Sequence, residues 1–218
     1  DPERTIEAVE RYFGGIPSGP EKPPARPGDL GPLSGVREET VDEEVPSPAY
    51  FAMFTLPSDG GDDIEAAELA VEILGGGSGS RLYDRMVRRD QIATEVWAGV
   101  TRLASGPSLA IVEAIGPDPE KISAVLDEEL RRFAEHGPDA DETARATAQA
   151  ERGFLEQTET VTGLANALSQ NATQFGDPAR VFTAPGRAAA VTGDAIKEMA
   201  GRWLAPGART ALTYGGTS

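Results

Sequence analysis

The sequence predicts an α+β domain in which an antiparallel or mixed sheet is covered by helices. Three observations support this fold class. Apolar residues recur at helical spacing in some segments and form short strand-like runs in others. Beyond residue 35 these segments follow in blocks, β-β-α-α-β-β-α-α-α-β, whereas a doubly wound α/β fold would alternate strictly. Two strand-like segments, 94–103 and 108–115, are joined by Ala104-Ser105-Gly106-Pro107, which predicts an antiparallel hairpin.

The chain begins with a predicted helix. Asp1 is a typical N-cap residue and Pro2 a typical first helical residue. Apolar side chains then recur at helical spacing as far as Phe13, and Gly14 and Gly15 end the helix. So short a helix cannot bury its apolar side by itself, so we expect it to be the tail of a preceding domain.

A Pro/Gly-rich segment separates this helix from the rest of the chain. Residues 17–35 have no apolar period, which predicts a linker of polyproline character. The sequence therefore predicts three parts: a terminal helix (1–16), a linker (17–35) and the main α+β domain (36–218).

The main domain begins with two predicted strands and two predicted helices. Residues 36–45 form an acidic strand, and 50–56 form an apolar strand that we expect to be buried on both faces. Asp62–Glu65 has the pattern of a capping box and opens an apolar helix that ends at the glycines from Gly75 onward. A second helix is predicted over 80–90.

Helices dominate the second half of the chain. Asp118 is the predicted cap of an amphipathic helix. Asp139–Glu142 is a second capping-box pattern and opens a long helical stretch with a break near 158–163. Thr192 caps the last helix, and residues 210–214 alternate as a closing strand.

Composition excludes several kinds of partner. The chain has 20 Lys and Arg against 36 Asp and Glu, a formal net charge of −16. Nucleic acids and anionic membrane surfaces attract clustered basic residues, so both are disfavoured as partners. No apolar run approaches the roughly 20 residues that a membrane-spanning helix needs.

The residue counts also exclude several chemistries. The 218 residues include one His and no Cys. Zinc sites built from His or Cys need more such ligands, and a Ser-His-Asp triad could only use His136. His136 itself closes a predicted helix, where the helix dipole favours it, so we interpret it as structural. A domain of this size does not need disulfides, so the absence of Cys does not indicate whether the protein belongs to an oxidising or a reducing compartment.

The run Gly75–Gly79 superficially resembles a phosphate-binding loop. A P-loop follows a strand and ends in Gly-Lys-Ser/Thr, whereas this run follows a predicted helix and has no Lys. We therefore favour a corner between two helices over an anion site. Trp97 and Trp203 are interpreted as core anchors rather than ligand platforms.

Four arginines are concentrated in the helix that follows this corner. Arg81, Arg85 and Arg88 have the spacing of one helical face, with Arg89 beside them. This face could contact an anion or a peptide carboxylate. Salt bridges to the surplus acidic residues are the simpler expectation.

Residues 69–99 carry a resemblance to a known family. They combine an apolar helix, the Gly-rich corner, Ser80-Arg81-Leu82-Tyr83, a second helix and a strand. This pattern resembles the inactive domain of the M16 metallopeptidases, the insulinase, pitrilysin and mitochondrial processing peptidase family. The resemblance implies a LuxS/MPP-like metallohydrolase half-domain, and it implies that residues 1–16 end a preceding zinc-bearing domain.

The resemblance implies a non-catalytic role in a zinc metalloprotease. The family's catalytic half carries His-x-x-Glu-His, which binds zinc and supplies the general base, and this chain has no such motif. The chain is then expected to hold no metal ligand and no catalytic residue, with zinc in the other half of the parent hydrolase. Its role would be to form part of a chamber that encloses a peptide.

The resemblance also implies partners. These are the zinc-bearing M16 domain or subunit and a peptide or unfolded polypeptide, in a homo- or heterodimer of the bacterial cytoplasm or periplasm. Two alternatives remain open. One is a catalytically dead partner or scaffold subunit of the same family, and the other is an unrelated acidic α+β interaction module.

In active M16 pairs the inactive half often contributes an Arg and a Tyr that reach the substrate. Alignment on the Ser80–Tyr83 motif places these positions at Val87 and Thr94, and a register slip of one residue would bring in Arg88. The candidates for substrate contact are therefore the following: Arg81, Arg88, Arg89 and Thr94. The acidic balance predicts a preference for basic peptides if the acidic side chains face the chamber.

Overall fold

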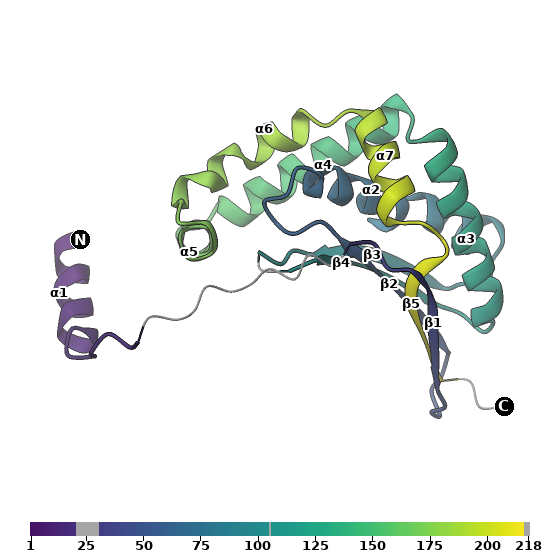
Figure 1. The fold of residues 1–218 in the computed structure, drawn as a ribbon, viewed down its shortest axis with the longest axis horizontal. Coiled ribbons are helices and arrows are strands. Elements are labelled where there is room, and N and C mark those ends of the chain that lie inside the picture. Colours follow the sequence, from purple (N-terminus) through teal and green to yellow (C-terminus); the bar gives the residue numbers. More distant parts are fainter. Residues whose placement is uncertain (21–30, 105, 216–218) are drawn as a thin grey trace.

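The computed structural model describes residues 1–20, 31–104 and 106–215 (Figure 1). Strands and helices follow the predicted order, with two further helical elements before the last helix. The elements are α1 (Pro2–Phe13), β1 (Gly35–Val41), β2 (Ala49–Leu56), α2 (Ile64–Gly75), the π-helix η1 (Tyr83–Arg89), β3 (Glu95–Thr101), β4 (Ser108–Ile115), α3 (Pro119–His136), α4 (Ala140–Thr158), α5 (Val161–Phe175), the 3-10 helix η2 (Pro178–Thr183), α6 (Ala184–Ala189), α7 (Gly193–Trp203) and β5 (Ala208–Tyr214).

The five strands form one mixed sheet in the order β1-β5-β2-β4-β3. The predicted hairpin is confirmed, because β3 and β4 pair antiparallel with Glu95 opposite Ile115. β2 lies between β4 and β5 and is antiparallel to both, whereas β1 runs parallel to β5. The predicted α+β fold class is therefore confirmed.

The helices from α2 to α7 all lie on one face of the sheet, and none of the described residues forms a helix on the other face (Figure 1). In the described part of the chain, no helix is both long enough and apolar enough to cross a membrane. This one-sided covering divides the sheet into a face that belongs to the core and a face that we call the open face.

Strand β2 follows this division. Tyr50, Ala52 and Phe54 are buried on the helical side, whereas Phe51 and Met53 on the open face are only partly buried. The expectation that this strand is buried on both faces was therefore wrong for the open face, because no second layer covers it.

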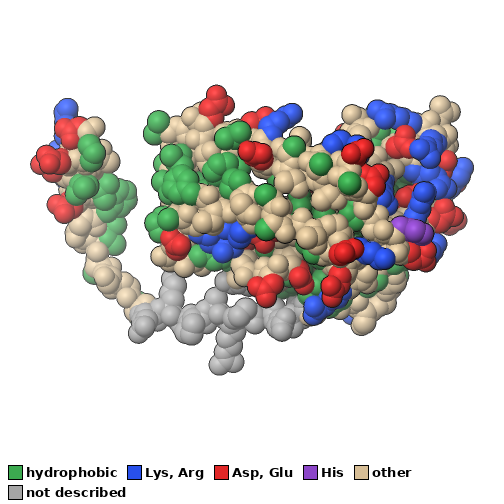
Figure 2. Space-filling model, turned by 90° about the horizontal axis from the view of Figure 1, so that it is seen from above, with side chains coloured by type: hydrophobic (Ala, Val, Ile, Leu, Met, Phe, Trp, Pro, Cys, Tyr) green, Lys and Arg blue, Asp and Glu red, His purple; other side chains and the backbone are tan. Residues whose placement is uncertain are grey.

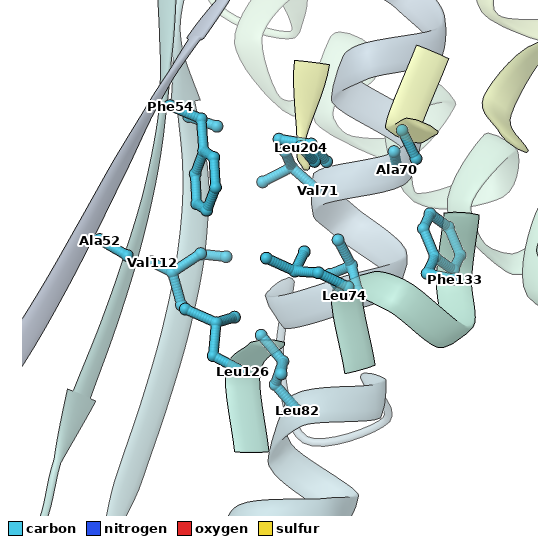
Figure 3. Close-up of a cluster of buried hydrophobic side chains, with 14 of the residues drawn as sticks. Ala52, Phe54, Ala70, Val71, Leu74, Leu82, Val112, Leu126, Phe133 and Leu204 are labelled. Atoms are coloured by element: carbon cyan, nitrogen blue, oxygen red, sulfur yellow. The ribbon is translucent and has the colours of Figure 1, made fainter. Parts of the chain in front are cut away.

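Helix α2 is the centre of the core. Nine of its twelve residues are buried. Val71 and Leu74 face Phe54 of β2 and Val112 of β4 (Figure 3). On its other sides α2 packs against α4, α6 and α7. Its all-round apolar sequence is therefore explained by burial on nearly every side.

The capping box predicted at Asp62–Glu65 does not form. Asp63 is the N-cap residue of α2, but its side chain makes no capping hydrogen bond. Glu65 accepts a hydrogen bond from Arg187 Nε at 2.7 Å and lies 3.9 Å from Arg102 Nη2. The carboxylate of Glu65 therefore bonds to Arg187 on α6 instead of to the backbone N–H that a capping box would use.

The other predicted caps form. Asp118 accepts from the N–H of Lys121, and Thr192 accepts from the N–H of Ala195. The Asp139–Glu142 box is complete, with both side chains bonded to the opposite backbone N–H. The long helical stretch breaks at residues 159–160, as predicted.

Arg209 on β5 is a buried charge that the sequence pattern did not predict. Its side chain is 2% exposed. Its Nε donates to Tyr50 Oη at 3.1 Å, its Nη2 donates to Ser123 Oγ at 2.9 Å, and its Nη1 pairs with Asp127. Burial lowers the pKa of Arg209, but the tyrosine and the carboxylate outweigh it, so the pKa rises. This cluster ties the last strand to β2 and α3.

Arg81 fastens the segment before η1 to two other helices. Its Nε and Nη2 donate to the two oxygens of Glu142 at 2.6 Å each, and Nη2 also donates to the carbonyl of Gly137 at 3.0 Å. The guanidinium lies 4.7 Å from the centre of the Phe133 ring. Glu142 also accepts from the N–H of Asp139 at 2.8 Å, so one carboxylate serves both a helix cap and this ion pair.

We predict that Gly75→Ala destabilises the domain by about 1–3 kcal/mol, because overpacking strains a core. A Cβ at this position would lie 2.4 Å from Ala98 Cβ, so α2 would have to move away from β3. The matched control is Gly153→Ala on α4, where a Cβ would meet nothing within 4 Å. It should gain about 0.5–1 kcal/mol from helix propensity. Urea unfolding measures both, and equal effects would contradict the prediction.

We predict that Glu142→Gln lowers the free energy of unfolding at neutral pH by about 1–3 kcal/mol, as for a lost charged hydrogen bond. Partial burial raises the pKa of Glu142, but the bonds from Arg81 and the Asp139 N–H outweigh it and hold the pKa below its ordinary value of 4.5. The ion pair therefore stabilises the fold above pH 4.5, and this contribution is lost as the pH falls through the lowered pKa.

Unfolding of both proteins as a function of pH measures this difference. Glu156→Gln is the control, because it removes an exposed i,i+4 pair with Arg152. That change should cost less than about 0.5 kcal/mol. A difference between the parent protein and Glu142→Gln that grew toward acid pH would contradict the prediction.

Candidate functional site

The Gly-rich segment forms the predicted corner between two helices. α2 ends at Gly75, and Gly77 has a φ of +132°, a conformation that side chains rarely adopt. A cavity of about 350 Å³ adjoins the corner and is lined in part by the carboxylates of Glu72 and Glu142. Burial raises the pKa of Glu72. Glu72 and Glu142 outnumber Arg145, the one basic residue of the lining, which disfavours an anion and agrees with the corner interpretation.

The helix after the corner is a π-helix over Tyr83–Arg89 instead of the regular α-helix that the spacing predicted. The N–H of Asp90 reaches back five residues to the carbonyl of Arg85 at 2.9 Å. Arg81, Arg85 and Arg88 nevertheless line one groove, so the predicted grouping of these arginines is kept. π-Helical turns are frequent at functional sites.

Most of the arginines in this segment have acidic partners, as the simpler expectation stated. Arg85 lies 2.7 Å from Asp90 and 3.0 Å from Glu128. Arg89 lies 2.7 Å from Asp84, although its side chain remains 69% exposed. Arg81 is committed to Glu142 by the contacts given above. The pairs of Arg85 with Glu128 and of Arg81 with Glu142 therefore join the segment to α3 and α4, whereas Arg89 pairs within η1.

Arg88 differs from the other three. Its guanidinium lies 5.4 Å from the centre of the Tyr83 ring, and within residues 1–20, 31–104 and 106–215 it takes part in no ion pair. Arg81, Arg88 and Arg89 line one open groove of about 750 Å³ together with His136. Basic side chains gather with the single His at this end of the helical face (Figure 2). The structure thus brings three of the four substrate-contact candidates to one groove.

Thr94, the fourth candidate, does not line that groove. It is exposed just before β3, and both its N–H and its hydroxyl bond to the carbonyl of Ile115, at 2.8 and 3.2 Å. Val87, the other position indicated by the alignment, packs against the core. Neither position presents a free hydrogen-bond donor comparable to an Arg or a Tyr.

The residues described in the structure do not fit a zinc ion. Among them no three His, Cys, Asp or Glu side chains are placed to hold a metal. His136 lies at the exposed end of α3, with Nδ1 3.1 Å from the carbonyl of Arg132, which suits the structural role predicted for it.

The open face of the sheet is the other candidate surface. Strand register places Glu39, Leu212, Phe51, Glu113 and Trp97 in one row from β1 to β3. Leu212, Phe51 and Glu113 are partly buried, and Glu39 is exposed. The face therefore has an apolar centre with carboxylates near both edges of the sheet.

Trp97 corrects one sequence interpretation. It is 48% exposed on the open face and is not a core anchor, whereas Trp203 is 7% exposed and does belong to the core. The alternation of side chains along β3 indicates the correct face, because Val96 and Ala98 are buried and Trp97 therefore points to the opposite side of the sheet. The missing information was that no layer covers that face.

Comparison with known proteins assigns the family. Residues 1–150 match the family model of the peptidase M16 inactive domain. No protein with a curated description is similar enough in sequence to match the chain.

Solved structures agree with this match. A candidate zinc protease from Bordetella pertussis Tohama I is 26% identical over 77% of this chain and 93% of its own, with a TM-score of 0.69. The inactive peptidase domain of a candidate zinc protease from Bordetella parapertussis is 25% identical over 82% and 95%, with a TM-score of 0.72.

A third solved structure is longer than this chain. A protease from Helicobacter pylori is 17% identical with a TM-score of 0.79 over 99% of this chain, which spans only 52% of that protein. At this identity the likeness shows the fold alone. On the family match and the shared fold, the chain belongs to the family of peptidase M16 inactive domains.

Proposed function

We propose that this domain is the non-catalytic C-terminal half of a zinc metalloprotease and forms one wall of a chamber that encloses a peptide. The open face of the sheet carries this proposal. All helices from α2 to α7 lie on the opposite face, so Phe51, Met53 and Trp97 are left without a covering layer. A sheet face that combines apolar and charged side chains suits an extended peptide, which offers both backbone and side chains.

The proposed role of this domain is to shape the chamber and to bind the peptide, without taking part in the hydrolysis step. The described residues bring together no metal ligands, and Val87 and Thr94 supply no Arg/Tyr pair. Zinc, the general base and the catalytic hydrogen bonds would then belong to a zinc-bearing M16 domain or subunit. The groove with Arg81, Arg88 and Arg89 is proposed as a secondary contact for the peptide. Thr94 is left out of this proposed contact, because its N–H and hydroxyl both bond to the carbonyl of Ile115.

The helix α1 is proposed to belong with that zinc-bearing domain, and residues 17–35 to be the linker; of these, 21–30 lie outside the described residues. Apolar side chains run along α1 (Figure 2), yet no residue of α1 is buried. Exposed apolar side chains indicate a missing partner surface. The side chains concerned are Ile6, Val9, Tyr12 and Phe13 of α1, together with Ile16 just after it.

A second candidate is a catalytically dead partner or scaffold subunit of the same family. It is favoured by the two positions where an Arg/Tyr pair is absent, Val87 and Thr94. In a scaffold, the open face would bind another protein permanently instead of a passing peptide. An unrelated acidic module is not supported, because the chain matches the family and has the helix corner over a helix-backed sheet.

We predict that the chain alone, supplied with zinc, does not hydrolyse an unfolded peptide, because it gathers no zinc ligands. Addition of the zinc-bearing half should produce hydrolysis that a chelator abolishes. A quenched fluorescent peptide measures both. Robust, chelator-sensitive turnover by the chain alone would refute the proposed function.

We predict that Phe51→Asp lowers kcat/KM of the assembled two-half enzyme, because it places an uncompensated charge in the centre of the chamber wall. The matched control is Leu155→Asp on α4, where the side chain is 57% exposed on the helical layer. It should leave turnover unchanged. Circular dichroism and size-exclusion chromatography check folding and assembly. If both variants assembled and retained full turnover, the scaffold role would be favoured.

A further inference from the structure

We propose that Trp97, Glu95 and Glu113 form a subsite on the open face for a Lys or Arg side chain of an extended peptide. This inference rests on the proposed function and names the substrate chemistry of one part of the chamber wall. The three side chains come from the neighbouring strands β3 and β4.

The strand register brings the three residues together. Trp97 lies directly opposite Glu113, and Glu95 precedes Trp97 by two residues on the same face. Directly opposed residues have Cβ atoms about 4.5–5.5 Å apart, and diagonal neighbours are within reach of long side chains. Glu113, directly opposite Trp97, can therefore approach a cation that sits on the indole, and Glu95 adds negative charge two residues earlier on the same face.

Gly99 leaves room for the indole of Trp97 to lie over the sheet. A Cβ at Gly99 would lie 2.4 Å from Cζ2 and 2.6 Å from Cη2 of Trp97, so the indole extends across the glycine. Because the ring lies over the sheet and is still 48% exposed, part of its π-surface remains available. A platform that is already positioned costs little conformational entropy when it binds.

The charges beside Trp97 favour a positively charged ligand. Neither Glu95 nor Glu113 has an ion-pair partner among residues 1–20, 31–104 and 106–215, and Glu113 is partly buried. Arg37 shares the open face but lies on β1, at the opposite edge of the sheet. With strands about 4.8 Å apart, four strand spacings separate it from Trp97. A cation above the indole is attracted by the ring and by both carboxylates.

The position of β3 favours an extended peptide as the occupant. β3 is an edge strand of the five-stranded sheet. A peptide can lie alongside it with main-chain hydrogen bonds while its alternate side chains reach the open face. A second copy of this chain, with a net charge of −16, is electrostatically unfavourable at the same place.

The test measures binding of dye-labelled unfolded peptides to the whole chain by fluorescence anisotropy. Three peptides differ at one central residue, which is Lys, norleucine or Glu. We expect the Lys peptide to bind most tightly and the Glu peptide least. An exposed cation–π contact corresponds to about a two- to fivefold preference for Lys over norleucine. Added salt should reduce that preference.

Variants test whether the preference for the Lys peptide arises at this subsite. Trp97→Leu should remove the preference for Lys over norleucine, and Glu113→Gln should weaken binding of the Lys peptide about two- to fivefold. Glu151→Gln is the matched control, because it makes the same charge change at an exposed position on α4 and should have no effect. Circular dichroism verifies that each variant is folded.

The outcomes separate this inference from the proposed function. If the three peptides bound equally well and Trp97→Leu changed nothing, the subsite would be wrong while the chamber wall would stand. An equal loss in Glu151→Gln and Glu113→Gln would also overturn the subsite, because it would show a general effect of net charge. Failure of every peptide to bind would overturn both proposals.

Discussion

The burial of α2 is the constraint on which the rest of the structure depends. A helix that is apolar on nearly all sides cannot lie between a sheet and water, so other helices must surround it. α4, α6 and α7 do so, and α2 approaches β3 closely because Gly75 has no side chain to separate it from Ala98. The helices are thereby gathered on one side, and the opposite side of the sheet is left open.

In a chain with a large excess of acidic residues, arginines hold the periphery to this core. Arg102 joins the end of β3 to Asp59 and to Glu68 of α2. Arg209 joins β5 to Asp127 of α3. Each arginine reaches across the fold to a carboxylate far away in the sequence. Because acids outnumber bases, the buried or half-buried Arg81, Arg102 and Arg209 all have carboxylate partners. The exposed Arg88 has none among the described residues.

The parts of the fold that depend on local sequence were predictable. Asp118 and Asp139 cap helices because their carboxylates meet N–H groups only three residues away. Features that depend on distant contacts were not predictable. The carboxylate of Glu65 accepts a hydrogen bond from the distant Arg187 instead of capping α2. The π-helical turn ends in a backbone hydrogen bond from Asp90 to Arg85, which no residue pattern predicts. The alternation of β3 places Trp97 on the face opposite Val96 and Ala98, but whether a second layer covers that face depends on the arrangement of distant helices.

The parallel pairing of β1 with β5 sets an order in which the sheet can be completed. Among the described residues, β1 is the first strand of the sheet and pairs with β5 alone, and β5 is the last described element. Since no residue of β1 is buried, backbone hydrogen bonds to β5 account for most of what holds it. During synthesis on the ribosome, β1 must wait for nearly the whole domain to emerge. Tension along the segment that enters β1 would accordingly peel this strand away first and leave the packed helices and the remaining strands intact.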